Sequence, residues 1–453
     1  MKNIIKTSPF FLLLLSAPVF LFGQTTDKML NLKEAVQLSL HNSKTLRMSS
    51  AKVEQAISMY EEAKDNQLPD LKVSGAYLYL PTPKLNLKLG SSNKSSNDSS
   101  SSSSSFPNVH QAVYGMISAS LPLYAGGKIS NGIKSAEYLA NAAKLDVQSD
   151  KEEVIQNTID AYYNLYKANA AVRLVTENLH TAQQRTKDFT NLEANGIIAR
   201  NDLMKAELQQ SNVELALLDA QNNLKIANFN FDLMLGLNDS TTILIDSSDI
   251  LPEPDVQSVA ALEAMAHSNR FDYLALLQRR QAATYNTKVV KGNELPTIAL
   301  TGGYIAADIP QVLSAYNIIN VGVGVSYNIG SLYKNKAKVR QAKTQEEMLQ
   351  IEQQQMDDNI RTQIFQAYNN YLHSVKKIDV YKTAISQAEE NYRITKNKYD
   401  NALATATDLL DADVALLQAK IDFEYARADA AVSYNKIYET VGLLNKKLNQ
   451  NNQ

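Results

Sequence analysis

Residues 154–163 read Val154-Ile155-Gln156-Asn157-Thr158-Ile159-Asp160-Ala161-Tyr162-Tyr163, within a proline-free segment from Lys128 to about Leu237. The segment has a mostly helical pattern, interrupted by a turn-like Glu193-Ala194-Asn195-Gly196 and resumed at Asp202-Leu203-Met204. In the resumed arm, apolar and small residues alternate at spacings of four and three: Val213, Leu217, Ala220, Leu224, Ala227, Phe231 and Met234. This spacing predicts a long helical hairpin whose second arm packs along a coiled-coil seam.

The same arrangement occurs a second time. A shift of 206 residues places Asp202-Leu203 on Asp408-Leu409 and Gly236-Leu237 on Gly442-Leu443, with no insertion between them. The seam maps onto Ala419, Phe423, Ala426, Ala430, Ser433, Ile437 and Thr440. Two long helical hairpins in one chain therefore indicate an internal duplication.

The duplication predicts how the whole chain is divided. We expect a signal peptide at 1–23, a first repeat at 24–238, a linker at 239–256, a second repeat at 257–443 and a flexible tail at 444–453. The first repeat comprises helices, a β-hairpin at 70–124 and a helical hairpin at 128–237; the second comprises a helix at 261–291, a β-hairpin at 297–328 with a loop at 307–316, and a helical hairpin at 332–443. Strand-to-helix corners are expected at Gly126, Gly127 and Gly330. A serine-rich stretch at 91–105 is too polar to offset its ordering entropy and is expected to be a solvated loop.

The composition and the residue spacing exclude several classes of function. The formal charge is −2 with both signs interspersed, so there is no electrostatic footprint for nucleic acid. No cysteine is present, which excludes a disulfide framework, a thiolate zinc site and a lipid anchor on sulfur. The five histidines have no metal-ligand spacing, and no phosphate loop or serine elbow occurs. We therefore predict no enzyme activity, no metal site and no cofactor.

The N-terminal residues indicate export. Lys2 and Lys6 precede an apolar run from Phe10 to Phe22, which ends at Gly23-Gln24. This order is typical of a secretory signal. A transmembrane anchor is the alternative, but the run has about 13 residues where roughly 20 are needed to span a bilayer. Any membrane insertion of the mature chain must then use strands.

The strands have a pattern that suits a membrane. In the expected strand at 317–328, one face carries Ile319, Val321, Val323, Val325 and Tyr327, and the other carries Asn320, Gly322, Gly324, Ser326 and Asn328. Tyrosines near the strand ends fit an interfacial girdle. The alternative is a pair of half-buried hairpins packed on the helices. Four strands cannot close a barrel, which needs about eight, so two, three or four protomers would supply 8, 12 or 16 strands.

The chain resembles the TolC-like outer-membrane efflux proteins, or outer-membrane factors, over nearly all of its mature length. The matching pieces are Leu32-Lys33-Glu34-Ala35-Val36, Leu68-Pro69, Leu121-Pro122-Leu123-Tyr124-Ala125-Gly126-Gly127, Asp202-Leu203-Met204-Lys205-Ala206-Glu207 and Asp408-Leu409-Leu410-Asp411-Ala412. The resemblance implies a mainly α fold with transmembrane β. The duplicated helical hairpins would form a periplasmic α-barrel, and four strands per protomer would contribute to a trimeric 12-stranded outer-membrane β-barrel.

The resemblance also implies the function. It implies a passive exit duct of a tripartite efflux or type I secretion system, surrounded by outer-membrane lipid. A homotrimer would dock with a periplasmic adaptor (membrane fusion) protein and an inner-membrane RND or ABC-type pump. The docking turns would be Asn195 with Gly196 and Asn401 with Ala402. The alternative from another class is a soluble periplasmic coiled-coil scaffold or adaptor without channel activity.

Two functional features are carried over from the family. Its electronegative constriction falls on Asp408 and Asp411, which would form rings of negative charge in a trimer. Its tip-gating link, a hydrogen bond between an acid and a tyrosine, falls on Asp202 and Tyr399. The family's arginine at this tip is replaced by Ala404. The plainer alternatives are that Asp202 and Asp408 cap helices, and that Tyr399 covers a neighbouring helix.

Overall fold

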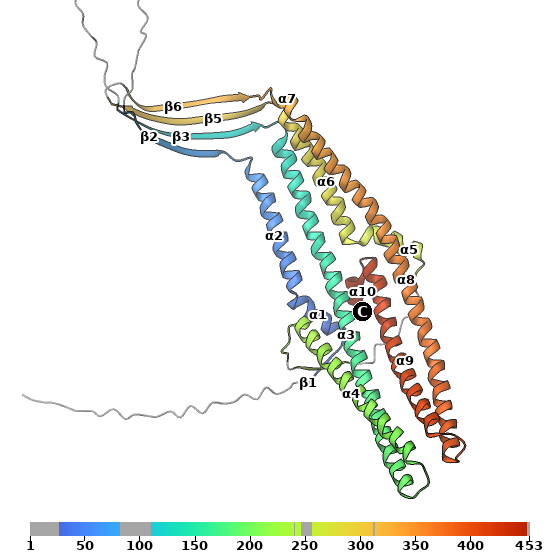
Figure 1. The fold of residues 1–453 in the computed structure, drawn as a ribbon. Helices are drawn as coiled ribbons and strands as arrows, with labels where there is room; N and C mark the ends of the chain where they lie inside the picture. Colours follow the sequence, from blue (N-terminus) through green and yellow to red (C-terminus); the bar gives the residue numbers. More distant parts are fainter. Residues whose placement is uncertain (1–26, 82–109, 240, 246–255, 311–312, 451–453) are drawn as a thin grey trace, which may run out of the picture. The chain divides into compact units, whose positions relative to one another are not determined.

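The computed structural model describes residues 27–81, 110–239, 241–245, 256–310 and 313–450. The predicted signal peptide at 1–23, the serine-rich stretch at 91–105 and most of the predicted linker lie outside these ranges. The described chain contains long helices, several shorter ones, a four-stranded sheet and a two-stranded sheet (Figure 1). Among the described helices, none combines the length and the apolar character that a bilayer crossing requires.

By its internal contacts the chain divides into two compact units. The hairpin-turn unit comprises Met1–Asn42, Asn157–Pro252 and Ser374–Val432. The sheet unit comprises Ser43–Gln156, Glu253–His373 and Ser433–Gln453. Each unit contains segments from both sequence repeats, so neither copy of the duplication is a separate body.

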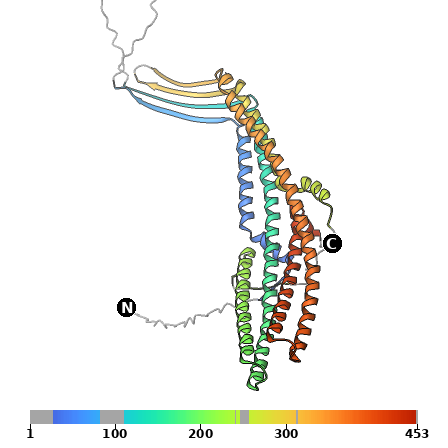
Figure 2. The same cartoon turned by 45° about the vertical axis from the view of Figure 1, so that its right-hand side comes forward.

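The sheet unit contains β2 (Asp70–Tyr79), β3 (Gln111–Tyr124), β5 (Thr297–Ile309) and β6 (Leu313–Ser326). These strands lie side by side in the order β2-β3-β5-β6, and every pair is antiparallel (Figure 2). The four strands per protomer that the fold class predicts are therefore present. The loop expected at 307–316 is shorter, because Ala307 pairs with Ala315 and Ile309 with Leu313 across the two strands.

The apolar face of β6 is uncovered within the protomer. Ile319, Val321, Val323 and Val325 expose 74, 77, 63 and 69 % of their surface. The outer edges of β2 and β6 have no strand partner in the described part of the chain. The sheet is thus not a pair of half-buried hairpins packed on helices. It needs apolar surroundings and further strands beside its two edges.

The two corners between strand and helix differ. Gly126 and Gly127 have φ of 65° and 74°, between the end of β3 and the start of α3 (Lys128–Ala194). A Cβ on Gly126 would stand 2.4 Å from the Gly292 carbonyl oxygen, so only glycine fits. Gly330, which precedes α7 (Ser331–Lys334) and α8 (Lys336–Asp400), has an ordinary right-handed backbone with φ −59°. Only the first corner needs the freedom of glycine.

Short helices complete the sheet unit. Ser43 caps α2 (Lys44–Asp65), because its hydroxyl accepts a hydrogen bond from Leu46 N at 3.2 Å. The prediction of one continuous helix at 261–291 is wrong. Arg270 separates α5 (Val259–Asn269) from α6 (Phe271–Lys291). Arg270 has an extended backbone, and its guanidinium Nη2 binds Asp272 Oδ2 at 2.6 Å. The 3₁₀ helix η1 (Gly292–Glu294) follows α6.

The tail predicted to be flexible at 444–453 is instead helical over α10 (Leu444–Gln450). Leu444 is fully buried, and its backbone N donates to Glu152 Oε2 at 2.8 Å. Asn445 N donates to Glu152 Oε1 at 3.2 Å, so one carboxylate caps the new helix. Burial raises the pKa of Glu152 to about 7 despite these hydrogen bonds.

The hairpin-turn unit contains α1 (Leu32–Asn42), α4 (Arg200–Leu235) and most of α9 (Ala406–Thr440). The predicted seam is buried or half-buried along both α4 and α9. β1 (Asp27–Leu30) pairs in parallel with β4 (Thr242–Ile245), a two-stranded sheet that the sequence did not predict. β4 lies within the stretch expected to be a linker.

The duplication is visible in the contacts at the ends of α4 and α9. Gly236 and Gly442 have φ of 67° and 72° at equivalent positions. A Cβ on Gly236 would lie 2.8 Å from Asn42 Cγ, and a Cβ on Gly442 would lie 2.7 Å from Asn269 O. Asn42 and Asn269 are themselves equivalent residues of the two repeats. In both copies, therefore, the glycine after the helix packs against the same asparagine position.

Candidate functional site

The two helical hairpins of the hairpin-turn unit end in exposed turns of similar geometry. One joins α3 to α4 and the other joins α8 to α9 (Figure 2). Gly196 and its equivalent Ala402 are both left-handed, with φ of 71° and 59°. Asn195 Nδ2 donates to Asn191 O at 2.6 Å, and Asn401 Nδ2 donates to Asn397 O at 2.7 Å. All four predicted docking residues are exposed in these turns.

A small apolar core joins the two hairpins beneath the turns. Phe189, Leu203, Ala206 and Ala406 are buried together, and Tyr399 packs against them. The rings of Phe189 and Tyr399 stack with centroids 5.4 Å apart. The interpretation that Tyr399 covers a neighbouring helix is therefore supported.

The predicted link between Asp202 and Tyr399 is not formed as a hydrogen bond. The Tyr399 hydroxyl is buried without a hydrogen-bond partner among the described residues. Burial and the charges of Asp202 and Asp400 raise the pKa of Tyr399. Asp202 Oδ1 instead lies 3.4 Å from Lys205 Nζ, one turn along the same helix. The two predicted residues are thus brought near each other without a direct bond.

Asp408 takes part in a reciprocal cap at the start of α9. Its Oδ2 accepts hydrogen bonds from Thr405 N at 2.8 Å and Thr405 Oγ1 at 2.7 Å. Asp408 N donates in return to Thr405 Oγ1 at 3.2 Å. This is the geometry of a capping box. The hydrogen bonds from Thr405 hold the pKa of Asp408 below its usual range, so the carboxylate is ionised at neutral pH.

The second predicted constriction acid lies beside the first. Asp411 follows Asp408 by three residues on the helix, and both side chains are exposed. They line one open groove between α8 and α9, together with Asn391 and Lys398. The structure therefore brings the two carboxylates together on one side of the hairpin, whereas Asp202 does not cap its helix. The N-cap of α4 is Ala199, which makes no side-chain hydrogen bond.

A buried ion pair near the turns was not predicted. Arg185 Nη1 of α3 binds Asp413 Oδ2 of α9 at 2.9 Å, and both side chains are buried. Arg185 Nη2 also donates to the Tyr392 hydroxyl of α8 at 3.0 Å. One guanidinium thus connects three helices from both repeats. No local pattern in the sequence indicates this pair, because its members belong to different helices.

A second polar contact lies farther along the α3–α9 interface of the same unit. The Tyr166 hydroxyl donates to the Glu424 carboxylate, and Lys167 pairs with Asp429. The pKa of Tyr166 is raised to about 12, mainly by burial and secondly by the hydrogen bond to Glu424. Arg427 Nη1 also binds Glu424 Oε2 at 3.1 Å. Charged side chains therefore hold the first copy against the second at two places along the α3–α9 interface.

Residues 80–237 and 262–443 match a family model described as "Outer membrane efflux protein". The chain belongs to the outer membrane efflux protein family. It is 24 % identical to the outer membrane efflux protein BepC of Brucella suis over 66 % of this chain and 67 % of that protein. It is 23 % identical to the outer membrane protein TolC of Escherichia coli over 92 % of this chain and 83 % of that protein. The structure of the Campylobacter jejuni CmeC outer membrane channel superposes with a TM-score of 0.74 at 19 % identity, covering 92 % and 88 % of the two chains.

Membership of this family explains why the apolar face of β6 is uncovered within the protomer. This efflux protein is an outer-membrane protein, and its fold is that of the TolC-like channels, with long helical hairpins and membrane strands. It acts as an exit duct in the outer membrane rather than as a soluble scaffold. The family and the fold are those of channel proteins, not of enzymes.

Proposed function

We propose that this efflux protein works as a passive homotrimeric duct that docks with a periplasmic adaptor and an inner-membrane pump of the RND or ABC type. The open four-stranded sheet carries the proposal, since its two free edges need partner strands and its apolar face needs lipid. Three protomers would supply 12 strands, above the roughly eight that the smallest closed barrel needs. The duct serves either tripartite efflux or type I secretion.

The helices also present a surface for sister protomers. Along α4, large apolar side chains are exposed in a stripe with spacings near multiples of a helical turn: Met204, Leu208, Leu215, Leu218, Phe229 and Leu233. This stripe is separate from the buried seam that packs within the protomer. A second apolar face on one helix is typical of a helix with neighbours on both sides. Adjacent protomers would cover it in a closed ring of helices.

The two hairpins differ in the charge they offer to a lumen. Asp408 and Asp411 of the second copy correspond to Asp202 and Lys205 of the first, so only the second copy carries an unneutralised pair of acids. Three copies of that pair would form two rings of three carboxylates each. Such rings attract cations and repel anions. The cap on Thr405 does not remove this role, because it keeps the Asp408 carboxylate charged.

The buried contact of Arg185 with Asp413 and Tyr392 replaces the missing arginine at position 404. It holds α3 of the first copy against α8 and α9 of the second, within one protomer. Opening of the duct by movement of the second hairpin would have to separate these groups. We therefore assign Arg185 as the residue that stabilises the closed hairpin arrangement.

Ion selectivity in planar bilayers tests the proposal. The purified protein is expected to form cation-selective pores, and Asp408→Asn with Asp411→Asn should lower the cation-to-anion permeability ratio severalfold. Asparagine retains a capping oxygen, so the helix start should persist. Glu207→Gln with Asp219→Asn, two exposed acids of α4, is the matched control and should leave the ratio unchanged. The absence of any pore would refute the duct, and unchanged selectivity in the first variant would remove the two aspartates from the lumen.

A further inference from the structure

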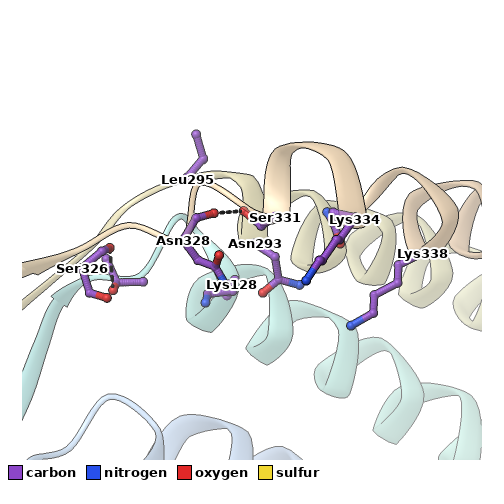
Figure 3. Close-up of a pocket in the computed structure, with 10 residues that line it drawn as sticks. Lys128, Asn293, Leu295, Ser326, Asn328, Ser331, Lys334 and Lys338 are labelled. Carbon is purple, nitrogen blue, oxygen red and sulfur yellow. Dashed lines mark hydrogen bonds between the residues drawn. The ribbon is translucent and has the colours of Figure 1, made fainter.

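A basic pocket lies at the second strand-to-helix corner of the sheet unit (Figure 3). It has a volume of about 420 Å³, and three lysines line it: Lys128 at the start of α3, Lys334 at the end of α7 and Lys338 in the first turn of α8. Asn293 and Asn328 add side-chain amides to the same lining. Ammonium and amide groups are donors, so the pocket suits a ligand rich in acceptor oxygens.

The pocket lies on the polar side of the sheet. Thr297 of β5 and Ser326 of β6 line it, and these two residues pair across the strands. Paired residues of antiparallel strands point to the same side, and neighbours along one strand point to opposite sides. The pocket is therefore on the side opposite to Val323 and Val325, whose exposed apolar face needs lipid. In a closed barrel, this polar side faces the interior.

The positive charge of the pocket is not neutralised by the protein. Among the described residues, none of the three lysines takes part in an ion pair. Lys334 Nζ lies 6.0 Å from the centre of the Tyr333 ring, a contact that leaves its charge in place. The neighbouring positions on the polar side of the sheet, Ala299, Thr301 and Gly324, are small and uncharged. An anion would therefore find unpaired cations here.

The lining of the pocket is held in place by a buried asparagine. Asn335, which also lines the pocket, exposes 4 % of its surface. Its Nδ2 donates to Val290 O at 2.8 Å and to Glu294 Oε1 at 3.1 Å. These bonds join the end of α6 and η1 to the start of α8, and they occupy one oxygen of the Glu294 carboxylate. The chain segments that carry Asn293, Lys334 and Lys338 are thus fixed relative to one another.

Both copies of the duplication contribute to the pocket. Lys128 and Lys334 are 206 residues apart, which is the repeat offset, so each copy places a lysine directly after its returning strand. The Lys128 side chain passes across Gly292, where a Cβ would stand 2.7 Å from Lys128 Cγ. The two equivalent lysines therefore line one cavity rather than two separate surfaces.

We propose that this pocket binds the carboxylate or phosphate group of anionic cargo on the inner wall of the duct. The three ammonium groups bind the anionic oxygens, and the amides of Asn293 and Asn328 donate further hydrogen bonds. Three such pockets in a trimer would form a positively charged ring, which is how basic side chains select anions in pores. The inference rests on the proposed duct, because it needs the polar side of the sheet to line a passage.

Binding of pyrophosphate to the purified full-length protein tests the site. Isothermal titration calorimetry at low ionic strength should show saturable binding to the wild type. The variant Lys128→Gln/Lys334→Gln/Lys338→Gln should bind at least tenfold more weakly. Lys336→Gln/Arg340→Gln/Lys343→Gln, which removes three exposed charges of α8 that do not line the pocket, should bind normally. Equal binding by the two triple variants would show general charge attraction and would overturn the proposal.

Bilayer conductance tests whether the bound anion lies in the passage. Pyrophosphate should lower the conductance of wild-type pores and leave that of the pocket variant unchanged. Citrate, which offers carboxylates in place of phosphates, should act in the same way, and its failure to do so would overturn the assignment to both kinds of group. Wild-type pores that bind pyrophosphate without a change in conductance would remove the pocket from the lumen but leave the duct intact. The absence of any pore would instead refute the duct, and the cargo role with it.

Discussion

The two hairpin turns occupy equivalent positions in the duplicated chain but are stabilised by different residues. In the first turn, Gly196 takes the left-handed backbone, and α4 begins after Ala199 without a side-chain cap. In the second, Ala402 takes the same backbone conformation, and Thr405 with Asp408 caps α9. One turn therefore relies on a permissive backbone and the other on hydrogen bonds.

The same divergence extends to the charges. Asp202 is neutralised by Lys205, whereas the equivalent Asp408 is joined by a second acid, Asp411. The two copies thus share a scaffold, and different residues at equivalent positions make one turn neutral and the other acidic. The difference teaches that a shared helix start does not imply a shared role for the aspartate in it.

Removal of Arg185 should have the largest effect, because it removes the buried contact that joins α3 of the first copy to α8 and α9 of the second. Arg185→Ala leaves Asp413 buried without its partner, which costs about 3–5 kcal/mol in proteins. We expect a lower thermal unfolding temperature and pores that open more frequently in bilayers. The exposed neighbour Lys187→Ala is the control.

A double variant tests whether the unpaired buried charge of Asp413 causes the loss of stability in Arg185→Ala. Arg185→Met with Asp413→Leu removes both charges and should recover most of the stability lost in Arg185→Ala, because no buried charge is left without a partner. If Arg185→Ala alone melts and conducts like the wild type, the ion pair does not hold the hairpins together.

The C-terminal ends of the two hairpins differ in their response to pH. Among the described residues that follow the two hairpins, those of the second copy alone continue into a helix, α10, capped by Glu152. The pKa of this carboxyl is raised from about 4.5 to about 7, so the folded state binds the proton more tightly than the unfolded state does. Its contribution, roughly 3 kcal/mol, is present below pH 4.5 and is lost as the pH rises through 7.

Thermal unfolding between pH 4 and pH 8 measures this contribution. The unfolding temperature of Glu152→Gln should vary less with pH than that of the wild type, since glutamine does not titrate. The wild type should lose stability relative to this variant as the pH rises. Parallel pH profiles for the two proteins would contradict the assignment to Glu152.

Loss of the reciprocal cap should have a smaller effect, confined to the second turn. Thr405→Val keeps the shape of the side chain but removes the hydroxyl that bonds Asp408, at a cost of about 1 kcal/mol. Amide hydrogen exchange should quicken in the first turn of α9. The equivalent Ala199→Val removes no cap and should leave exchange at the start of α4 unchanged.

The smallest effects are expected at the two left-handed residues. Gly196→Ala should destabilise the first turn by about 1 kcal/mol, because a side chain disfavours this backbone conformation. Ala402→Gly should be close to neutral, since relief of that strain is offset by the greater entropy of glycine in the unfolded chain. Thermal unfolding of the two variants measures both changes, and a stabilising Gly196→Ala would show that the first turn does not depend on glycine.

Much of the fold was predictable because its signals are local. The seam of α4, its copy in α9 and the alternating residues of β6 each lie within one element, where periodicity alone indicates structure. Ser43 is of a residue type that commonly caps helices. Its equivalent Arg270 is not, and an arginine held in place by Asp272 and the Thr440 carbonyl gives no local sign of a helix break.

The remaining features depend on which distant residues meet. The pair of Arg185 with Asp413 requires the mutual register of α3 and α9, and no spacing within either helix contains it. β1 and β4 have four residues each, too few for a periodic signal, and pair across more than 200 residues of chain. Gly330 was predicted from its residue type, yet its backbone has no need of glycine.

The bare margins of the four-stranded sheet have a consequence for biogenesis. A newly exported monomer carries rows of unsatisfied backbone groups along β2 and β6, beside an apolar face that water cannot solvate well. Such a monomer can pair with the exposed strands of other chains. It must therefore assemble quickly, or a chaperone must cover its strand edges until it does. When synthesis outpaces trimer formation, the excess chains should precipitate through these strands, while their helical hairpins remain folded.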